Sequence, residues 1–284
     1  DPRNNWAPMI WGQLKPHCPR ERFKRCDDGT YEATGDRIKY EAPAGTATRA
    51  IFLAGAVDWA TVQSDASIPR LWTEGAKKAG AALTAGYAAI ALPGIYSGYR
   101  SKATLGTPIA PCLIPEVAAM AQAVGVQYLV FDQDEKTKTR RNVAIALSRF
   151  GQLLQAQGCT VKIERWSAKQ GKGLDDLIAK HGADAFHTAV DQALTLDEFE
   201  LWQALENRLK TAPSVVMKAS DLTTLQPESV PDSGVIAIAS AKGTGKSKLI
   251  GGLIEDQNKA LLAGHRICLM RNLSERCGVS YRGD

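Results

Sequence analysis

Two aspartates separated by one residue, Asp132 and Asp134, follow an apolar run of strand-forming residues at positions 128–131. In an open α/β sheet, ligands bind at the carboxyl ends of the strands. Because alternate residues of an extended segment face the same side, the two carboxylates can converge on one point. Mg²⁺ takes one or two protein carboxylates and fills its other positions with water and phosphate oxygens. The pair therefore predicts a magnesium site, and the alternative interpretation is a solvated turn after the strand.

A third carboxylate, Glu74, ends an earlier apolar strand just before a Gly and an Ala-rich helix. If the two strands are neighbours, three carboxylates face one crevice, where their repulsion requires a divalent cation or a retained proton. We therefore expect Glu74, Asp132 and Asp134 to be the catalytic residues and to bind Mg²⁺ or Mn²⁺. Glu74 is also suited to act as a general acid or base. Phosphoryl chemistry on a nucleotide needs little more than such positioning and charge stabilisation.

Strands and helices alternate along the middle of the chain. Strands are expected at residues 71–73, 87–92, 128–131 and 159–166, and helices at residues 76–85, 114–124, 139–157, 174–180 and 183–193, with a loop at residues 95–102. This alternation predicts an α/β fold with a mostly parallel sheet and flanking helices. The expected parts are an irregular, β-containing N-terminal accessory segment (1–69, with a strand or hairpin at 35–43), an α/β domain (70–195), a helix and linker (196–232) and the incomplete start of a second α/β domain (233–284).

Basic residues lie near the predicted ends of the same strands. They are Lys77, Lys78, Arg100, Lys102, Lys136, Lys138, Arg140, Arg141 and Lys172. Together they are suited to binding a triphosphate and the backbone of a DNA strand, with an affinity that falls as salt rises. The alternative interpretation is a set of solvated helix starts. The net charge of +5 permits nucleic acid as a partner without requiring it.

A phosphate-binding loop is predicted near the end of the chain. A buried strand at residues 235–239 precedes a Gly-Lys-Ser sequence that opens a helix, and a further helix is expected to end at Cys277. Glycine backbone N–H groups bind phosphates at a helix N-terminus, while the Lys and Ser reach the terminal phosphates and Mg²⁺. The residues expected to bind ATP are Gly243, Gly245, Lys246 and Ser247. The chain stops soon after, so we expect no appreciable ATP hydrolysis.

The positions of Glu74, Asp132 and Asp134 resemble those in the TOPRIM domain shared by bacterial primases and topoisomerases. That domain has a Glu after its first strand and Asp-x-Asp after its third. Glu74-Gly75 with the following helix is similar to the primase Glu-Gly helix. The stretch 171–178 is similar to the primase Gly-Lys-Asp-Pro-Asp-Asp motif, which implies two further metal ligands. They are Asp175 and Asp176.

The resemblance to primases covers residues 70–190 and departs from them in three places. Gln133 stands where primases usually have Gly, and residues 136–139 replace the usual Ala-Gly. Gly173-Leu174 replaces Asp-Pro, so one acidic position near the expected metal is missing.

Longer strings are similar to a cyanobacterial plasmid replication-initiator family, whose members carry a TOPRIM-like domain followed by a helicase. The strings are residues 11–16, 38–41, 74–79, 92–95 and 131–134. The resemblance implies plasmid DNA replication, with single-stranded or origin DNA and nucleoside triphosphates as partners. It also implies ATP as the cofactor of the helicase part, and oligomerisation through the helicase region that this chain lacks.

Two functions from different classes follow. The first is a metal-dependent, primase-like nucleotidyltransferase that synthesises primers on single-stranded DNA and is fused to an ATP-dependent helicase. The second is a non-catalytic initiator that recognises the origin or single strands through a TOPRIM-like fold. A TOPRIM nuclease, a topoisomerase and a haloacid-dehalogenase phosphatase fit less well, because the order or position of their motifs differs.

The composition is that of an ordinary globular protein, with 44% hydrophobic and 23% charged residues. No apolar stretch approaches the roughly 20 residues needed to span a bilayer. The chain opens on a polar segment without an initiator Met or a signal peptide. We therefore expect a cytoplasmic piece of a longer protein, with no membrane partner. Its scattered cysteines favour reduced, buried thiols over disulfides, and His17, Cys18 and Cys26 lack the second pair that a zinc finger needs.

Overall fold

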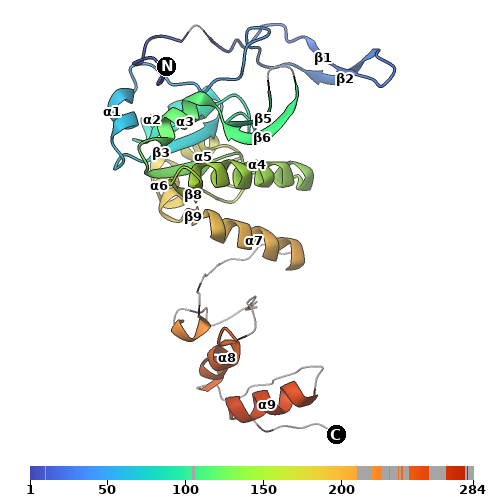
Figure 1. Ribbon diagram of the computed structural model, residues 1–284, viewed down its shortest axis with the longest axis vertical. Helices are drawn as coiled ribbons and strands as arrows, with labels where there is room; N and C mark the ends of the chain where they lie inside the picture. Colours follow the sequence, from blue (N-terminus) through green and yellow to red (C-terminus); the bar gives the residue numbers. More distant parts are fainter. Residues whose placement is uncertain are drawn as a thin grey trace. The chain divides into compact units, whose positions relative to one another are not determined.

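A five-stranded sheet lies at the centre of residues 1–213, one of the two units into which the chain divides in a computed structural model (Figure 1). The strands are β4 (Ala88–Leu92), β3 (Arg70–Glu74), β7 (Val126–Val130), β8 (Thr160–Ile163) and β9 (Leu194–Thr195), in this order across the sheet. The first four strands are parallel to one another, and β9 pairs antiparallel with β8 at the edge of the sheet. The structure confirms the predicted α/β fold with a mainly parallel sheet.

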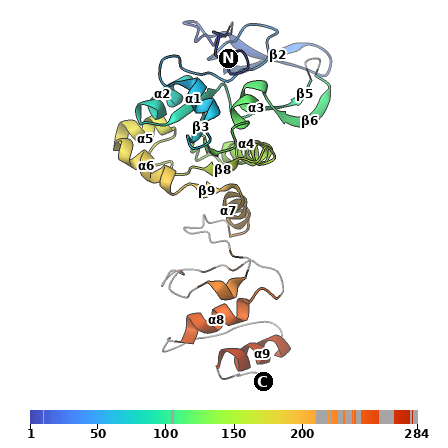
Figure 2. The same cartoon turned by 60° about the vertical axis from the view of Figure 1, so that its left-hand side comes forward.

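Helices pack on both faces of this sheet (Figure 2). One face carries α1 (Trp59–Ser64), α3 (Pro115–Ala121), α4 (Thr137–Gln155) and α7 (Leu196–Leu209), and the other carries α2 (Ala76–Thr84), α5 (Leu174–His181) and α6 (Ala183–Asp191). Successive residues of a strand face opposite sides. Trp72 and Leu129 therefore enter the core beneath α3 and α4, whereas Leu71 and Val130 enter the core beneath α2 and α5.

The structure describes residues 1–9, 11–103, 106–209, 221–225, 243–255 and 267–278, together with residues 219, 230, 236, 238 and 280. In the second unit, residues 214–284, it describes a short 3₁₀ turn, η1 (Leu222–Thr224), and two helices, α8 (Lys246–Glu255) and α9 (Ile267–Cys277). The predicted helix start at Lys246 and helix end at Cys277 are confirmed. The predicted strand at residues 235–239 falls almost entirely outside the described residues.

Two predictions outside the main sheet are wrong. The loop expected at residues 95–102 contains β5 (Tyr99–Lys102), which forms a separate two-stranded sheet with β6 (Pro108–Leu113). The hairpin expected at residues 35–43 lies earlier, as β1 (Glu21–Arg25) and β2 (Tyr31–Arg37). Every residue of β1 and β2 is exposed, so no alternation of polar and apolar residues marks these strands in the sequence.

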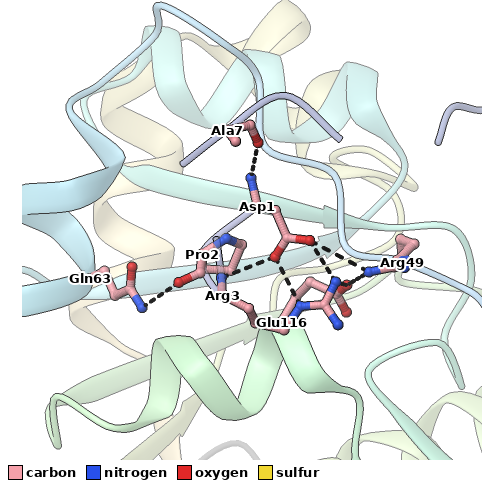
Figure 3. Close-up of polar contacts among 7 residues, drawn as sticks. All are labelled: Asp1, Pro2, Arg3, Ala7, Arg49, Gln63 and Glu116. Carbon is pink, nitrogen blue, oxygen red and sulfur yellow. Dashed lines mark hydrogen bonds and ion pairs between the residues drawn. The ribbon is translucent and has the colours of Figure 1, made fainter. Parts of the chain in front are cut away.

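A buried carboxylate attaches the N-terminal segment to α3 (Figure 3). Glu116 lies in the first turn of α3 and is fully buried. Its Oε1 lies 2.6 Å from Arg49 Nη1 and 3.1 Å from Arg3 Nη2. The Asp1 carboxylate contacts the same two guanidinium groups, at 3.6 Å from Arg49 and 2.5 Å from Arg3. Because an unpaired buried carboxylate is costly, this ion cluster holds both arginine-bearing stretches against the helix.

Aromatic side chains also attach the N-terminal segment to the core of the unit. The rings of Trp6, Phe52 and Trp59 contact one another, with centroids 5.0 to 6.1 Å apart, and they pack on the core shared with α3. An antiparallel bridge between Ile51 and Ala91 adds the same segment to the edge of β4. Residues of the N-terminal segment therefore form a wall beside the edge strand β4.

Two sequence-based expectations concern the whole chain. Among the cysteines whose side chains the structure describes, Cys159 is buried as expected, whereas Cys18 is exposed and Cys26, Cys112 and Cys277 are partly exposed. Within the described part of the chain, no helix has the length and apolar character needed to cross a bilayer.

The ion cluster on α3 yields a stability prediction. Replacing Glu116 with Gln keeps the shape of the side chain but leaves Arg3 and Arg49 facing a neutral amide. We expect unfolding in urea to show a loss of roughly 2–3 kcal/mol, because the arginines are partly exposed and recover some hydration. Glu32→Gln, at an ion pair exposed on β2, should cost less than about 0.5 kcal/mol. Equal losses in the two variants would contradict the role given to Glu116.

Candidate metal and nucleotide site

The carboxyl ends of β3 and β7 bring two predicted site residues together. These strands are adjacent and parallel, with Thr73 opposite Val130 in the register. Glu74 is the last residue of β3, and Asp132 follows β7 after one intervening residue. The pKa of Glu74 is raised, first by burial and then by the negative charge of Asp132. This effect of Asp132 on Glu74 places the two carboxylates in one electrostatic environment.

Each aspartate of the Asp-x-Asp pair contacts its own lysine. Lys78 Nζ lies 2.7 Å from Asp132 Oδ1, and Lys172 Nζ lies 3.0 Å from Asp134 Oδ2. The pKa of Asp134 is lowered by a hydrogen bond from the backbone N–H of Lys136, 2.9 Å long, and by Lys172. The pKa of Lys172 is raised in turn, chiefly by its hydrogen bond to Asp134. The two aspartates are therefore negatively charged groups that already have cationic partners.

The loop between β8 and α5 supplies the rest of the site. Asp176 Oδ2 accepts a hydrogen bond of 3.3 Å from the backbone N–H of Gly173, so this carboxylate caps the first turn of α5. Asp175 points toward the same glycine, because a Cβ built on Gly173 would lie 2.4 Å from Asp175 Oδ1. Of the two aspartates that the primase resemblance adds, Asp175 therefore lies beside the carboxylate site and Asp176 stabilises the helix start.

A cavity of about 950 Å³ opens next to these residues. Glu74, Lys77, Lys78 and Asp175 line one side of it, and aromatic residues of the N-terminal segment, including Trp11, line the other. A cavity of this size accommodates a nucleotide-sized ligand. It combines charged groups suited to phosphates with an apolar surface suited to a base.

The remaining basic residues are divided among three places. Arg100 and Lys102 are exposed on β5, in the separate two-stranded sheet. Lys136 and Lys138 are exposed at the start of α4. Arg140 and Arg141 line a second cavity of about 660 Å³, which Asp132 and Asp134 also border, and Arg140 forms an ion pair with Glu206.

The chemistry of the donor set fits a divalent cation held by two protein carboxylates. Asp132 Oδ1 is buried and has no hydrogen-bond partner, and a cation at this oxygen would compete with the Lys78 ammonium that forms an ion pair with it. Mg²⁺ commonly uses one or two carboxylates and completes its shell with water and phosphate oxygens. In the part of the chain that the structure describes, no group of three His, Cys, Asp or Glu side chains is arranged as a metal site. Glu74 and Asp132 are thus suited to share an ion, while Asp134 faces Lys172.

Sequence analysis missed Glu164, which follows β8 at the same end of the sheet. Its side chain is fully buried, and neither carboxylate oxygen has a hydrogen-bond partner. Burial raises the pKa of Glu164 well above the ordinary value of a glutamate. The available signal was an acidic residue after Val161 and Ile163, inside a stretch that was predicted to be a buried strand.

The predicted phosphate-binding loop lies in the second unit. Gly243 and Gly245 have φ angles of +86° and +83°, a conformation that favours glycine, and Lys246 and Ser247 open α8. A Cβ on Gly245 would lie 2.5 Å from Thr223 Cγ2, so η1 packs closely on this turn. The two described glycines of the turn before α8 therefore adopt a backbone conformation that favours glycine.

Comparisons with known proteins match overlapping parts of the chain, over different lengths. Residues 58–185 match the model of a domain of unknown function, DUF3854. An uncharacterized protein from Picosynechococcus sp. is 36% identical over 265 residues, which cover 90% of this chain and 25% of that protein. The chain thus spans about a quarter of the length of this curated relative.

Solved structures with low sequence identity are also similar. A DnaG primase catalytic domain bound to single-stranded DNA is 19% identical, with a TM-score of 0.41, and the match covers 88% of this chain and 64% of that one. The Escherichia coli primase catalytic core is 18% identical, with a TM-score of 0.37 and coverage of 90% and 69%. The zinc-binding and RNA polymerase domains of the Aquifex aeolicus primase are 15% identical, with a TM-score of 0.37 and coverage of 67% and 40%.

The buried carboxyl of Glu164 generates a pH-dependent stability prediction. Its folded pKa is raised, so between the ordinary Glu pKa of about 4.3 and the folded value the native state holds a proton that the unfolded chain has lost. Wild-type stability should therefore fall as pH rises through this window, by about 1.4 kcal/mol for each pKa unit of difference. Glu164→Gln carries no titratable group and should remove this loss.

Urea unfolding at pH 5 and pH 8 measures the effect. We expect Glu164→Gln to be more stable than wild type at pH 8 and close to it at pH 5. Glu135→Gln, at an exposed position after the Asp-x-Asp pair, should keep the wild-type dependence on pH. An unchanged pH dependence in Glu164→Gln would show that Glu164 is ionised in the folded protein.

Proposed function

We propose that this chain is the primase-like part of a DNA replication protein. Its carboxylate site binds Mg²⁺ or Mn²⁺ and joins nucleotides on a single-stranded DNA template. The observation that carries the proposal is the meeting of Glu74 and Asp132 at the ends of two adjacent parallel strands, beside a nucleotide-sized cavity that Lys77 and Lys78 also line. The TOPRIM resemblance of these residues in sequence points to the same chemistry.

The proposed mechanism assigns a role to each group around the cavity. Asp132 and Glu74 would hold the cation, with Asp134 as a further ligand once it leaves Lys172. A divalent cation, when bound, would neutralise the charge that develops on the transferred phosphoryl group. If Asp132 and Asp134 hold the cation instead, Glu74, whose pKa is raised in the metal-free chain, is suited to accept the proton of the attacking hydroxyl. Lys77 and Lys78 orient the triphosphate in the cavity.

The DNA-binding role falls to basic residues outside this cavity. Lys136 and Lys138 are exposed at the start of α4, and Arg141, on its next turn, lines the second cavity with Asp132 and Asp134. These three residues are suited to contact template phosphates. Arg100 and Lys102 on β5 supply a further basic surface on the same unit.

The second unit is proposed to begin an ATP-dependent helicase in the intact protein, which acts in plasmid DNA replication. The support is the glycine turn at Gly243 and Gly245 ahead of α8, together with the sequence resemblance to replication initiators. The proposed domain boundaries are residues 1–69, 70–195, 196–232 and 233–284. ATP binds through Gly243, Gly245, Lys246 and Ser247 in this proposal.

One observation favours a second function, a non-catalytic protein that binds the origin or single-stranded DNA. Both aspartates of the Asp-x-Asp pair contact lysines, and their charges are already balanced without a metal ion. A TOPRIM-like fold with such internally neutralised carboxylates would bind DNA through its basic residues and perform no chemistry.

Primer synthesis distinguishes the two functions. The chain is incubated with single-stranded DNA, NTPs or dNTPs, and Mg²⁺ or Mn²⁺, and products are resolved on a gel. We expect products that Asp132→Asn reduces at least on the order of 10²-fold, because loss of a metal ligand removes several kcal/mol of transition-state stabilisation. Glu135→Gln removes a neighbouring exposed charge and should leave synthesis unchanged.

DNA binding is measured in parallel by fluorescence anisotropy. Asp132→Asn should bind single strands at least as tightly as the wild type, since the lost carboxylate repels phosphates. DNA binding by the wild-type chain without any product would support the second function and contradict the first.

A further inference from the structure

Lys78 occupies an inner position in the carboxylate site. It lies in the first turn of α2, four residues after Glu74, and its side chain is 19% exposed, close to the 18% of its partner Asp132. The outer lysine, Lys172, is 58% exposed. An ion pair that is largely withdrawn from water is screened less than an exposed one. Lys78 is therefore the principal cation that balances Asp132 in the free protein.

Gly173 provides the space that Lys78 occupies. Its φ of −98° is accessible to every residue type, so the backbone conformation does not require glycine here. Glycine is needed here because the side chains of Lys78 and Asp175 approach its Cα closely. A Cβ on Gly173 would lie 2.5 Å from Lys78 Cε and 2.4 Å from Asp175 Oδ1, distances that no Cβ tolerates without movement of the neighbours. The same Cβ would lie 3.4 Å from Asp132 Oδ1, so Gly173 adjoins the ion pair itself.

A divalent cation and the Lys78 ammonium compete for the same oxygen. Nζ lies 2.7 Å from Asp132 Oδ1, so a metal ion that binds this atom would lie next to the ammonium. Like charges this close repel strongly in a partly buried site. A metal ion that binds Asp132 Oδ1 therefore competes with Lys78 for it.

We propose that Lys78 is a resident cation that excludes divalent metal from Asp132 until an anionic ligand enters the cavity and gives the ammonium a new partner. This inference rests on the proposed function, because it concerns the metal and nucleotide of that site. Lys78 lines the cavity, so a triphosphate bound there can accept its ammonium. Metal and triphosphate then bind cooperatively, because the binding of either one makes the binding free energy of the other more favourable. Lys78 is in this role a positioning and selectivity residue.

Manganese titration of the whole chain tests the competition directly. Free Mn²⁺ is followed by electron paramagnetic resonance in the wild type, in Lys78→Met and in Lys180→Met. Met keeps the length of the lysine stem and removes the charge. We expect Lys78→Met to bind Mn²⁺ at least about tenfold more tightly than wild type, because a like charge at the site is gone. Lys180 is exposed in the last turn of α5 and does not line the cavity, so Lys180→Met should change the affinity less than about twofold.

A second variant fills the space beside Lys78 and leaves the lysine charge unchanged. Gly173→Ala should push the Lys78 stem away from Asp132 and tighten Mn²⁺ binding in the same direction. Gly80→Ala is its matched control in α2, because a Cβ there meets only Leu53 at 3.6 Å, an ordinary contact. Adding a non-hydrolysable triphosphate should tighten Mn²⁺ binding in wild type several-fold more than in Lys78→Met.

The outcomes separate this inference from the proposed function. If wild type and Lys78→Met bind Mn²⁺ equally and Asp132→Asn does not bind it, the metal site stands and the competition is refuted. If none of the variants binds Mn²⁺, with or without triphosphate, the metal site fails and the competition fails with it. Tighter binding in Lys78→Met that Asp132→Asn abolishes in the same background supports both.

Discussion

The parallel pairing of β3 with β7 is the constraint on which the site depends. These two strands lie side by side although more than fifty residues separate them in the chain, and they are paired from Arg70–Gln127 to Thr73–Val130. Parallel pairing aligns their carboxyl ends, so the residues that follow each strand meet at one edge of the sheet. The pairing is stabilised by burial, because Trp72 and Leu129 are withdrawn from water on one face. Helices on both faces prevent water from reaching the ladder.

Charge balance decides what can happen at that edge. Carboxylates gathered by strand pairing would repel each other, and burial makes the repulsion stronger. The protein compensates in two ways. Lys78 and Lys172 pair with the aspartates, whereas Glu74 responds through a raised pKa. Glu164 shows the limiting case, a buried carboxyl without a hydrogen-bond partner whose pKa burial raises well above its ordinary value.

The N-terminal segment has a structural role that its sequence conceals. Glu116 on α3 pairs with two arginines from this segment, and the segment in turn supplies the aromatic wall of the large cavity. Its polar and irregular composition resembles that of a flexible arm. Ion pairs and aromatic contacts made with residues far along the chain order it instead, and pairing of this kind leaves no local pattern.

Secondary structure in the α/β part was predictable because the local signals agree. Val126–Val130 is apolar and rich in strand formers, and the Ala-rich stretch after Gly75 favours a helix of the observed length. The β5–β6 hairpin was missed for a physical reason. Its strands gain their stability from pairing with each other and from Tyr99 packing near Phe150, contacts that no local propensity encodes.

The sequence by itself determined the α/β class, the strand that ends at Glu74 and the strand that precedes Asp132, because hydrophobic periodicity and turn residues are local properties of the chain. Only the tertiary structure decided which side chains meet. It placed Lys78 against Asp132, Lys172 against Asp134, and Asp176 at a helix start. Those contacts arise from packing between distant segments, which fixes distances of a few ångströms that spacing along the chain does not specify.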